Sequence, residues 1–348
     1  MIIINQVKIG EDYDPYVIAE LSANHGGSID RAKESIQAAK NAGASAVKIQ
    51  SYTADTMTID SDKEDFQISE GLWKGFSLYQ LYKQAYTPFE WHEELFKFAK
   101  SINITLFSSP FDETAVDLLT KLDTPAFKIA SFELTDLPLV QYVAKQKKPV
   151  LMSTGMASLE EVAEAVECCK VNGNSQLLLF HCISSYPAST RDSNLLNIKA
   201  LKNEFNIEVG LSDHTTNNLA SALAISLGAV AIEKHFKLND EDCGPDSSFS
   251  LLPSELESLI TECNLVKSAM GSSAFGRAKS ESENKVFRRS IYFIKDLKAG
   301  HIITSNDIKR IRPGFGLEPK FFNQILGMKL ASDVERGDAV NWKNFTSK

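Results

Sequence analysis

Short apolar runs alternate with amphipathic stretches along the first 270 residues of this chain. The runs have the length of buried β-strands, and the first is Val17-Ile18-Ala19-Glu20. Seven further strands are predicted at 44–50, 104–108, 126–130, 149–153, 177–181, 207–211 and 230–235. Helices are predicted at 28–41, 88–101, 113–122, 137–145, 158–171, 195–204, 217–227 and 254–270. This alternation indicates a parallel sheet, and the number of strands favours a closed (β/α)8 TIM barrel over an open doubly wound sheet.

The 348 residues exceed what one hydrophobic core usually supports, so a second, smaller domain is expected. The strand and helix pattern ends near residue 272, and a segment rich in Gly, Ser and charged residues follows. Short strands broken by turns come after it. We therefore predict a barrel domain at 1–272, a linker at 273–287 and a small domain at 288–348.

Charge and cysteine content exclude several classes of protein. With 37 Lys and Arg against 45 Asp and Glu, the net charge of −8 argues against a nucleic-acid or anionic-membrane surface. No apolar stretch reaches the roughly 20 residues of a membrane span, and the first residues do not look like a signal peptide, so a cytoplasmic location is expected. The five cysteines include no Cys-x-x-Cys spacing, which predicts reduced thiols.

Two predicted neighbouring strands are followed by histidines. The motif at 210–214 ends in His214, and the motif at 233–235 ends in His235. If the strands are parallel neighbours, their ends lie about 5 Å apart, close enough for the two imidazoles to hold one metal ion. The alternative is that each histidine only caps its strand with a hydrogen bond.

Polar side chains crowd at the predicted carboxyl ends of the other strands, where barrels place their sites. They are Glu20, Lys48, Gln50, Ser109, Lys128, Ser131, Glu133, Ser153, Ser184, Ser212 and Glu233. Two lysines among several hydroxyls suit phosphate and carboxylate oxygens, and place cations locally in an acidic protein. A snorkelling lysine or a structural ion pair is the alternative for either lysine alone.

Ten short motifs, taken in order, resemble the sialic acid synthase family over nearly the whole chain. They are Ala19-Glu20, Asn24-His25, Val47-Lys48-Ile49-Gln50, Ser109-Pro110-Phe111, Lys128-Ile129-Ala130-Ser131, Ser153-Thr154-Gly155-Met156, Gly210-Leu211-Ser212-Asp213-His214, Glu233-Lys234-His235, Gly244-Pro245-Asp246 and Arg312-Pro313-Gly314. The small domain is similar to the antifreeze-like (SAF) domain of that family. The segments at 61–66, 71–73, 87–92 and 312–317 look most like its pseudaminic acid branch. Phe132 and Ser184 depart from the neuraminic acid pattern, which puts N-acetylmannosamine in doubt as the substrate.

The resemblance implies a metal-dependent condensation of phosphoenolpyruvate with 2,4-diacetamido-2,4,6-trideoxy-altrose, giving pseudaminic acid and phosphate. N-acetylneuraminate or legionaminate synthesis are the alternatives within the family. The implied roles are catalysis for Glu20, Glu133 and Asp246; phosphoenolpyruvate binding for Lys48, Lys128, Ser131, Ser153, Ser184 and Ser212; sugar binding for Gln50, Tyr186 and Arg312; and binding of Mn²⁺, Mg²⁺ or Co²⁺ for His214 and His235. The three carboxylates are not ranked. Arg312 is expected to reach the sugar in the other subunit of a domain-swapped homodimer.

Other readings of the same residues remain open. A barrel aldolase would use Lys48 or Lys128 as a Schiff base. A sugar- or ice-binding protein would use the small domain and carry an inactive barrel. The long insertion at 51–87, which contains several aromatic residues, is either a substrate lid or packing over the barrel rim.

Overall fold

The computed structural model describes residues 1–241, 244–271 and 275–346. The chain divides into two compact units, Met1–Gly271 and Ser272–Lys348. The predicted domain boundary at 272 and the first two residues of the predicted linker lie outside the described residues, as does Cys243.

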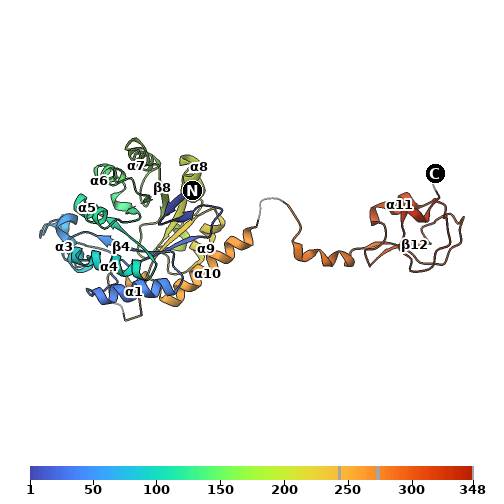
Figure 1. Ribbon diagram of the computed structural model, residues 1–348, viewed down its shortest axis with the longest axis horizontal. Helices are drawn as coiled ribbons and strands as arrows, with labels where there is room; N and C mark the ends of the chain where they lie inside the picture. Colours follow the sequence, from blue (N-terminus) through green and yellow to red (C-terminus); the bar gives the residue numbers. More distant parts are fainter. Residues whose placement is uncertain (242–243, 272–274, 347–348) are drawn as a thin grey trace. The chain divides into compact units, whose positions relative to one another are not determined.

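The first unit is the predicted (β/α)8 barrel, with the helices around the outside of the strands (Figure 1). Parallel strands close in the order β10-β3-β4-β5-β6-β7-β8-β9. Their bounds are β3 Tyr16–Glu20, β4 Ala46–Ser51, β5 Thr105–Pro110, β6 Phe127–Ile129, β7 Val150–Ser153, β8 Leu177–Cys182, β9 Glu208–Asp213 and β10 Ala231–His235. All eight predicted strands are therefore confirmed, and the histidine-bearing β9 and β10 are neighbours.

The helices of this unit bury one face against the strands. Their bounds are α1 Ile29–Asn41, α4 Phe89–Ser101, α5 Glu113–Lys121, α6 Leu137–Ala144, α7 Leu159–Val171, α8 Asn197–Phe205, α9 Leu219–Ser226 and α10 Pro253–Met270. In α1 the buried residues Ala32, Ile36 and Ala39 recur at helical spacing, and the predicted N-cap Ser28 accepts a hydrogen bond from the Arg31 amide. This packing builds the larger hydrophobic core between sheet and helices.

A hairpin at the start of the chain closes the amino end of the barrel. Its antiparallel strands are β1 Ile2–Ile4 and β2 Val7–Ile9. Ile2, Ile4 and Ile9 belong to the same buried cluster as apolar residues inside the barrel. The amide of Asn5 also donates to Thr105 at 3.1 Å. Because this end is sealed by apolar side chains, the polar residues are left at the carboxyl end of the strands.

The insertion after β4 contains two helices, α2 Ala54–Met57 and α3 Leu78–Ala85, and the short 3₁₀ helix η1 Glu64–Phe66. Other 3₁₀ turns of the first unit are η2 Ser131–Glu133, η3 Thr190–Asp192 and η4 Ser247–Phe249.

The second unit has a small core of its own. Its antiparallel strands are β11 Ser290–Phe293 and β12 Ile308–Ile311. They are accompanied by α11 Phe322–Ile325 and by η5 Lys279–Glu281, η6 Glu283–Phe287, η7 Pro319–Phe321 and η8 Trp342–Asn344. Ile291, Phe293 and Ile308 from the strands pack with Ile325 and Val340. The segment predicted as linker thus carries two short 3₁₀ helices in its described part.

Within the described residues, none of the helices combines the length and the apolar composition needed to cross a membrane.

Candidate active site

The alternation of side chains along β9 and β10 separates two buried polar groups. Glu233 and Ser212 are paired in the register and meet inside the barrel, where the Ser212 hydroxyl donates to Glu233 Oε1 at 3.2 Å. Lys234 and Asp213, one position further along each strand, pair with each other instead, at 2.8 Å. His214 and His235 then follow at the open end of the barrel.

Two lysines and two glutamates form a buried charge network in the barrel. Lys48 Nζ lies 3.1 Å from Glu20 Oε2 and 3.2 Å from Glu233 Oε1. Lys128 Nζ lies 3.1 Å from the same Glu233 oxygen. All four side chains are almost completely buried. Both predicted anion-binding lysines therefore share one carboxylate as a counter-ion.

Burial shifts the pKa values of this network in different directions. Burial raises the pKa of Glu233, but the Lys128 and Lys48 ammonium groups outweigh it and hold that pKa at about 2. Burial raises the pKa of Glu20, and its ion pair with Lys48 opposes that rise. Burial lowers the pKa of Lys128, whereas the Glu20 and Glu233 carboxylates hold the pKa of Lys48 above its ordinary value.

Hydroxyl groups that follow two strands converge beside Gly155. The Gly155 amide donates to Ser131 Oγ at 3.2 Å. A Cβ atom at position 155 would lie 2.2 Å from Ser184 Oγ and 2.7 Å from Ser131 Oγ, so a larger residue does not fit. Ser153, two residues earlier on β7, is buried and its hydroxyl has no hydrogen-bond partner among the described residues. The predicted serines that follow β6 and β8 are thus brought together beyond the end of β7.

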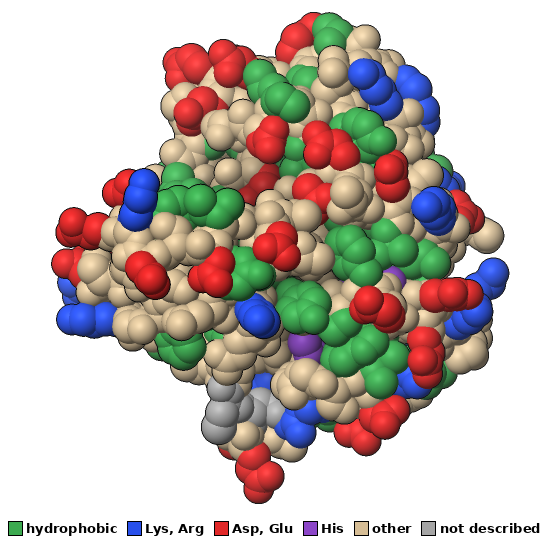
Figure 2. All heavy atoms as spheres, turned by 90° about the vertical axis from the view of Figure 1, so that its left-hand side faces the viewer, with side chains coloured by type: hydrophobic (Ala, Val, Ile, Leu, Met, Phe, Trp, Pro, Cys, Tyr) green, Lys and Arg blue, Asp and Glu red, His purple; other side chains and the backbone are tan. Residues whose placement is uncertain are grey.

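The two histidine rings lie side by side, with their centroids 5.3 Å apart. His214 Nδ1 donates to the Ile183 carbonyl oxygen at 2.9 Å, which leaves Nε2 with a lone pair in the neutral ring. Tyr186 packs on His214 with centroids 4.4 Å apart, and Phe249 packs on His235 at 4.9 Å. On the face shown in Figure 2, histidine surfaces show only as small patches among hydrophobic side chains.

The donor set fits a divalent metal that keeps open coordination positions. His235 Nδ1 is buried and lacks a hydrogen-bond partner among the described residues, with Asp246 Oδ2 3.8 Å away. Within residues 1–241, 244–271 and 275–346, no three His, Cys, Asp or Glu side chains form a metal-binding group on their own. Two imidazole nitrogens with available lone pairs are ligands that Mn²⁺ and similar ions accept.

A second polar group flanks the histidines. Asp246 accepts a hydrogen bond from the Ser22 hydroxyl. Gln50 Nε2 donates to Ser22 Oγ at 3.0 Å and to Glu20 Oε1 at 2.8 Å. Burial raises the pKa of Asp246, and the Ser22 hydrogen bond opposes that rise. This chain of contacts joins the predicted residues Glu20, Gln50 and Asp246.

Glu133 and Arg312 complete the predicted set. Glu133 ends η2 after β6, and burial raises the pKa of its carboxyl to about 7. Its Oε2 has no hydrogen-bond partner in the described part of the chain. Arg312 directly follows β12 in the second unit and is exposed there. The predicted site residues therefore lie at the carboxyl ends of the barrel strands or in the loops that follow them, except Arg312, which belongs to the other unit.

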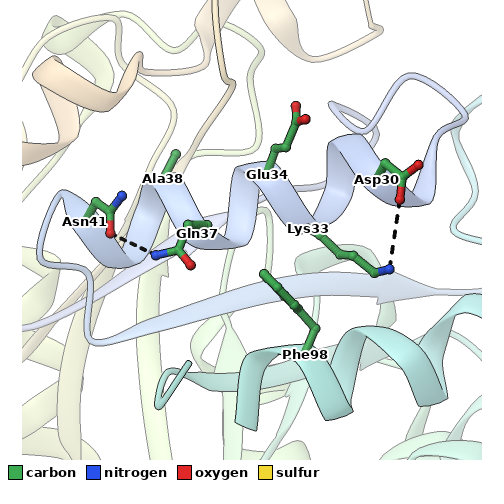
Figure 3. A pocket seen from close by; sticks show the side chains of 7 residues that line it. All are labelled: Asp30, Lys33, Glu34, Gln37, Ala38, Asn41 and Phe98. Atoms are coloured by element: carbon green, nitrogen blue, oxygen red, sulfur yellow. Dashed lines mark hydrogen bonds and ion pairs between the residues drawn. The ribbon is translucent and has the colours of Figure 1, made fainter. Parts of the chain in front are cut away.

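A shallow cleft on the outside of the barrel lies between α1 and α4 (Figure 3). Lys33 pairs with Glu94 across it, and Gln37 donates to Asn41 at 2.9 Å. Because these polar side chains are already paired with one another, we assign no chemistry to this cleft.

The chain was compared with protein-family models and with known proteins. The NeuB family model matches residues 35–274, and the SAF domain model matches residues 288–346. The chain belongs to the NeuB family. The sialic acid synthase resemblance and the antifreeze-like second domain are thereby confirmed.

Named relatives of this NeuB-family chain include synthases of several nonulosonic acids. Pseudaminic acid synthase from Campylobacter jejuni strain 81-176 is 45% identical, covering 96% of this chain and 97% of that protein. N,N'-diacetyllegionaminic acid synthase from Legionella pneumophila is 36% identical and covers 98% of both. The crystal structure of N-acetylneuraminic acid synthetase from Leptospira borgpetersenii, in complex with citrate, has a TM-score of 0.73 and 30% identity, covering 81% of this chain and 94% of that one.

Sequence reasoning left some site residues of this NeuB-family barrel without a role. Glu233 was noted only as a polar strand end, although it holds both lysines. The signal was present, because Glu233 lies two positions before His235 on the same strand and so faces the same side. Gly155 belongs to a recognised motif and Ser22 lies between two of them, yet their contacts with Asp246 and with the serines join loops that are far apart in sequence.

Proposed function

We propose that this chain is a pseudaminic acid synthase. It condenses phosphoenolpyruvate with 2,4-diacetamido-2,4,6-trideoxy-altrose to give pseudaminic acid and phosphate. C3 of the enolpyruvate forms a bond with the aldehyde carbon, water adds at C2, and the C2–O bond to phosphate breaks. The observation that carries the proposal is the 45% identity to the Campylobacter synthase over 96% of the chain, together with a site that pairs a cationic pocket with two histidines.

The cationic side of the site suits phosphoenolpyruvate. Lys48 and Lys128 supply the positive charge, and Ser131, Ser153, Ser184 and Ser212 supply hydroxyl donors. The unpartnered Ser153 hydroxyl is the kind of buried group that a bound oxygen satisfies. Fixing the phosphate and the carboxylate at both ends orients C3 for attack.

The histidine side of the site suits the sugar aldehyde. A divalent Mn²⁺, Mg²⁺ or Co²⁺ ion held by His214 and His235 would polarise the aldehyde oxygen. Tyr186 and Gln50 border the same space and contact the sugar in this proposal. Arg312 reaches it from the second subunit of a domain-swapped homodimer. The proposed location is the cytoplasm, with its supply of phosphoenolpyruvate.

Three carboxyl groups are available for proton transfer. Burial gives Glu20, Glu133 and Asp246 raised pKa values, so each holds a proton more readily than an exposed carboxyl group. Asp246 lies 3.8 Å from His235 and orients water for C2. Glu20 and Glu133 orient sugar hydroxyls and move protons.

A phosphate-release assay tests the proposal. Purified chain is offered phosphoenolpyruvate with the altrose derivative, its legionaminic counterpart or N-acetylmannosamine, with and without chelator. Chelator-sensitive release with the altrose derivative is the expected result. Turnover only with another sugar would reassign the product to N-acetylneuraminate or legionaminate. A covalent adduct trapped by borohydride would instead support a Schiff-base aldolase, and sugar binding unaffected by His214→Ala, without turnover, would support a binding protein.

A further inference from the structure

The insertion after β4 is fixed at both of its ends. Ser51, at its start, lies 2.6 Å from both His92 Nε2 and Ser108 Oγ. Thr87, at its end, lies 3.3 Å from His25 Nε2. All five side chains are buried, so the two ends are held by the barrel. The residues between these two ends are mostly exposed. The position of the middle of the insertion therefore depends on the contacts that its own side chains make with the barrel.

Trp73 makes such a contact in the middle of the insertion. Its indole Nε1 donates to the Pro245 carbonyl oxygen at 3.1 Å. Its ring also lies against the ring of Tyr186, with centroids 5.8 Å apart. Trp73 is half-buried although its neighbours Leu72 and Lys74 are exposed. One side chain thus joins the insertion to the loops that follow β8 and β10.

Both contacts of Trp73 lead to the histidine side of the site. Pro245 directly precedes Asp246, whose carboxylate lies 3.8 Å from His235. Tyr186 packs on His214 with centroids 4.4 Å apart and on Phe249 at 5.4 Å. The Trp73 indole therefore contacts Tyr186 and the residue before Asp246, and these two residues lie beside the histidines.

We propose that Trp73 is a positioning and specificity residue for the amino sugar. It fixes Tyr186 and the Asp246 loop, and it turns the insertion into a lid on the sugar side of the site. This inference rests on the proposed function. A sugar that carries two acetamido methyl groups and a deoxygenated C6 presents apolar surface, which matches an aromatic wall of Tyr186 and Phe249 that Trp73 supports.

Steady-state kinetics with two variants test the role. Trp73→Phe removes the N–H donor and keeps a ring, so the KM for the sugar should rise about fivefold. Trp73→Ala removes both contacts, and the KM for the sugar should rise on the order of 20- to 30-fold. The KM for phosphoenolpyruvate should stay within about twofold in both variants. Ile59→Ala, an exposed position 62% accessible in the same insertion, is the matched control and should behave as wild type.

The outcomes separate this inference from the proposed function. Wild-type turnover with an unchanged sugar KM in Trp73→Ala, or an equal rise in both KM values, would overturn the role of Trp73 and leave the synthase intact. Absence of wild-type turnover would instead overturn the synthase.

Limited trypsin digestion without any substrate tests the anchor separately. Lys63 and Lys74 are exposed cleavage sites in the insertion. We expect Trp73→Ala to be cut there faster than wild type and Ile59→Ala, and equal rates would overturn the anchor.

Discussion

Lys234 and Asp213 form a fully buried ion pair directly behind the two histidines. Lys234 Nζ lies 2.8 Å from Asp213 Oδ2, and the two residues are paired across β10 and β9. The same ammonium donates to the carbonyl oxygens of Thr215 at 2.7 Å and Asn217 at 2.8 Å. His214 therefore lies between Asp213 and Thr215, which both contact the Lys234 ammonium group. His235 directly follows Lys234 in the sequence. This ion pair therefore links the ends of the two strands that carry the imidazoles.

Replacing Lys234 by Met should cost about 3–5 kcal/mol in the free energy of unfolding, because it leaves Asp213 charged and buried. Urea unfolding measures this loss, and the double variant Lys234→Met/Asp213→Asn should recover part of it. Lys97→Met is the matched control, since its ion pair with Glu93 is exposed to solvent and contributes little to stability. A single Lys234 variant as stable as the control would show that the pair does not hold this region.

Glu233→Gln and Lys128→Met should change anion binding in opposite directions. Glu233 occupies both lysines, at 3.1 and 3.2 Å, so a phosphate has to compete with its carboxylate. The neutral amide should tighten binding of inorganic phosphate by about three- to tenfold, whereas losing Lys128 should weaken it by about tenfold or more. Calorimetric titration of phosphate measures both. Weaker binding in Glu233→Gln would mean that its carboxylate helps to hold the lysines in place for the anion.

The strand ends were predictable because their signals are local. An apolar run followed by a histidine marks β9 and β10, and the rule that parallel strands end on one side brings His214 and His235 together. Alternation along a strand further assigns Glu233 to the inside. These inferences need only neighbouring residues and a strand count.

The contacts between distant segments were not predictable in the same way. Lys48 on β4 and Lys128 on β6 meet Glu233 on β10, and these strands are not neighbours in the barrel. Whether these side chains meet depends on the radius of the barrel and on the lengths of the side chains. A short sequence pattern does not predict such a contact across the barrel. The Trp73 contact with Pro245 joins residues 172 positions apart, and the aromatic content of the insertion alone left a lid and rim packing equally open.

Arg312→Ala should weaken the sugar site alone. The KM for the sugar should rise about tenfold or more, since a lost charged hydrogen bond costs about 1.5–3 kcal/mol, and the KM for phosphoenolpyruvate should stay unchanged. Arg310→Ala is the matched control in the same unit, because the Arg310 guanidinium packs over Phe322 at 5.0 Å. Equal losses for both substrates would contradict the role of Arg312.

A mixing experiment tests whether Arg312 acts across subunits. Arg312→Ala and His214→Ala chains are unfolded together, refolded and assayed. In a swapped dimer, the intact barrel of the first chain receives the intact arginine of the second, so at low sugar concentration the mixture should be more active than either variant alone. A mixture no more active than its components would place Arg312 in its own chain's site or in none.

Glu133 should make the stability of the protein depend on pH. Burial raises its pKa to about 7, from the ordinary value of 4.5. Between these two values the folded chain binds a proton that the unfolded chain has lost, so the free energy of unfolding falls as pH rises through this window. Glu133→Gln lacks this proton. The stability of Glu133→Gln relative to wild type should therefore increase by on the order of 1–3 kcal/mol from pH 4.5 to pH 7. Above pH 7 this difference should stay constant.

Urea unfolding at pH 5 and pH 8 measures this difference, with Glu167→Gln on the exposed face of α7 as the control. A gap between Glu133→Gln and wild type that is the same at both pH values would mean that Glu133 does not titrate in this window. The same ionisation distinguishes the two chemical roles of Glu133. If its carboxylate is the base, wild-type kcat rises with pH through 7, and if its acid form donates the proton, kcat falls over the same range. Either slope should vanish in Glu133→Gln, because the amide cannot change its charge.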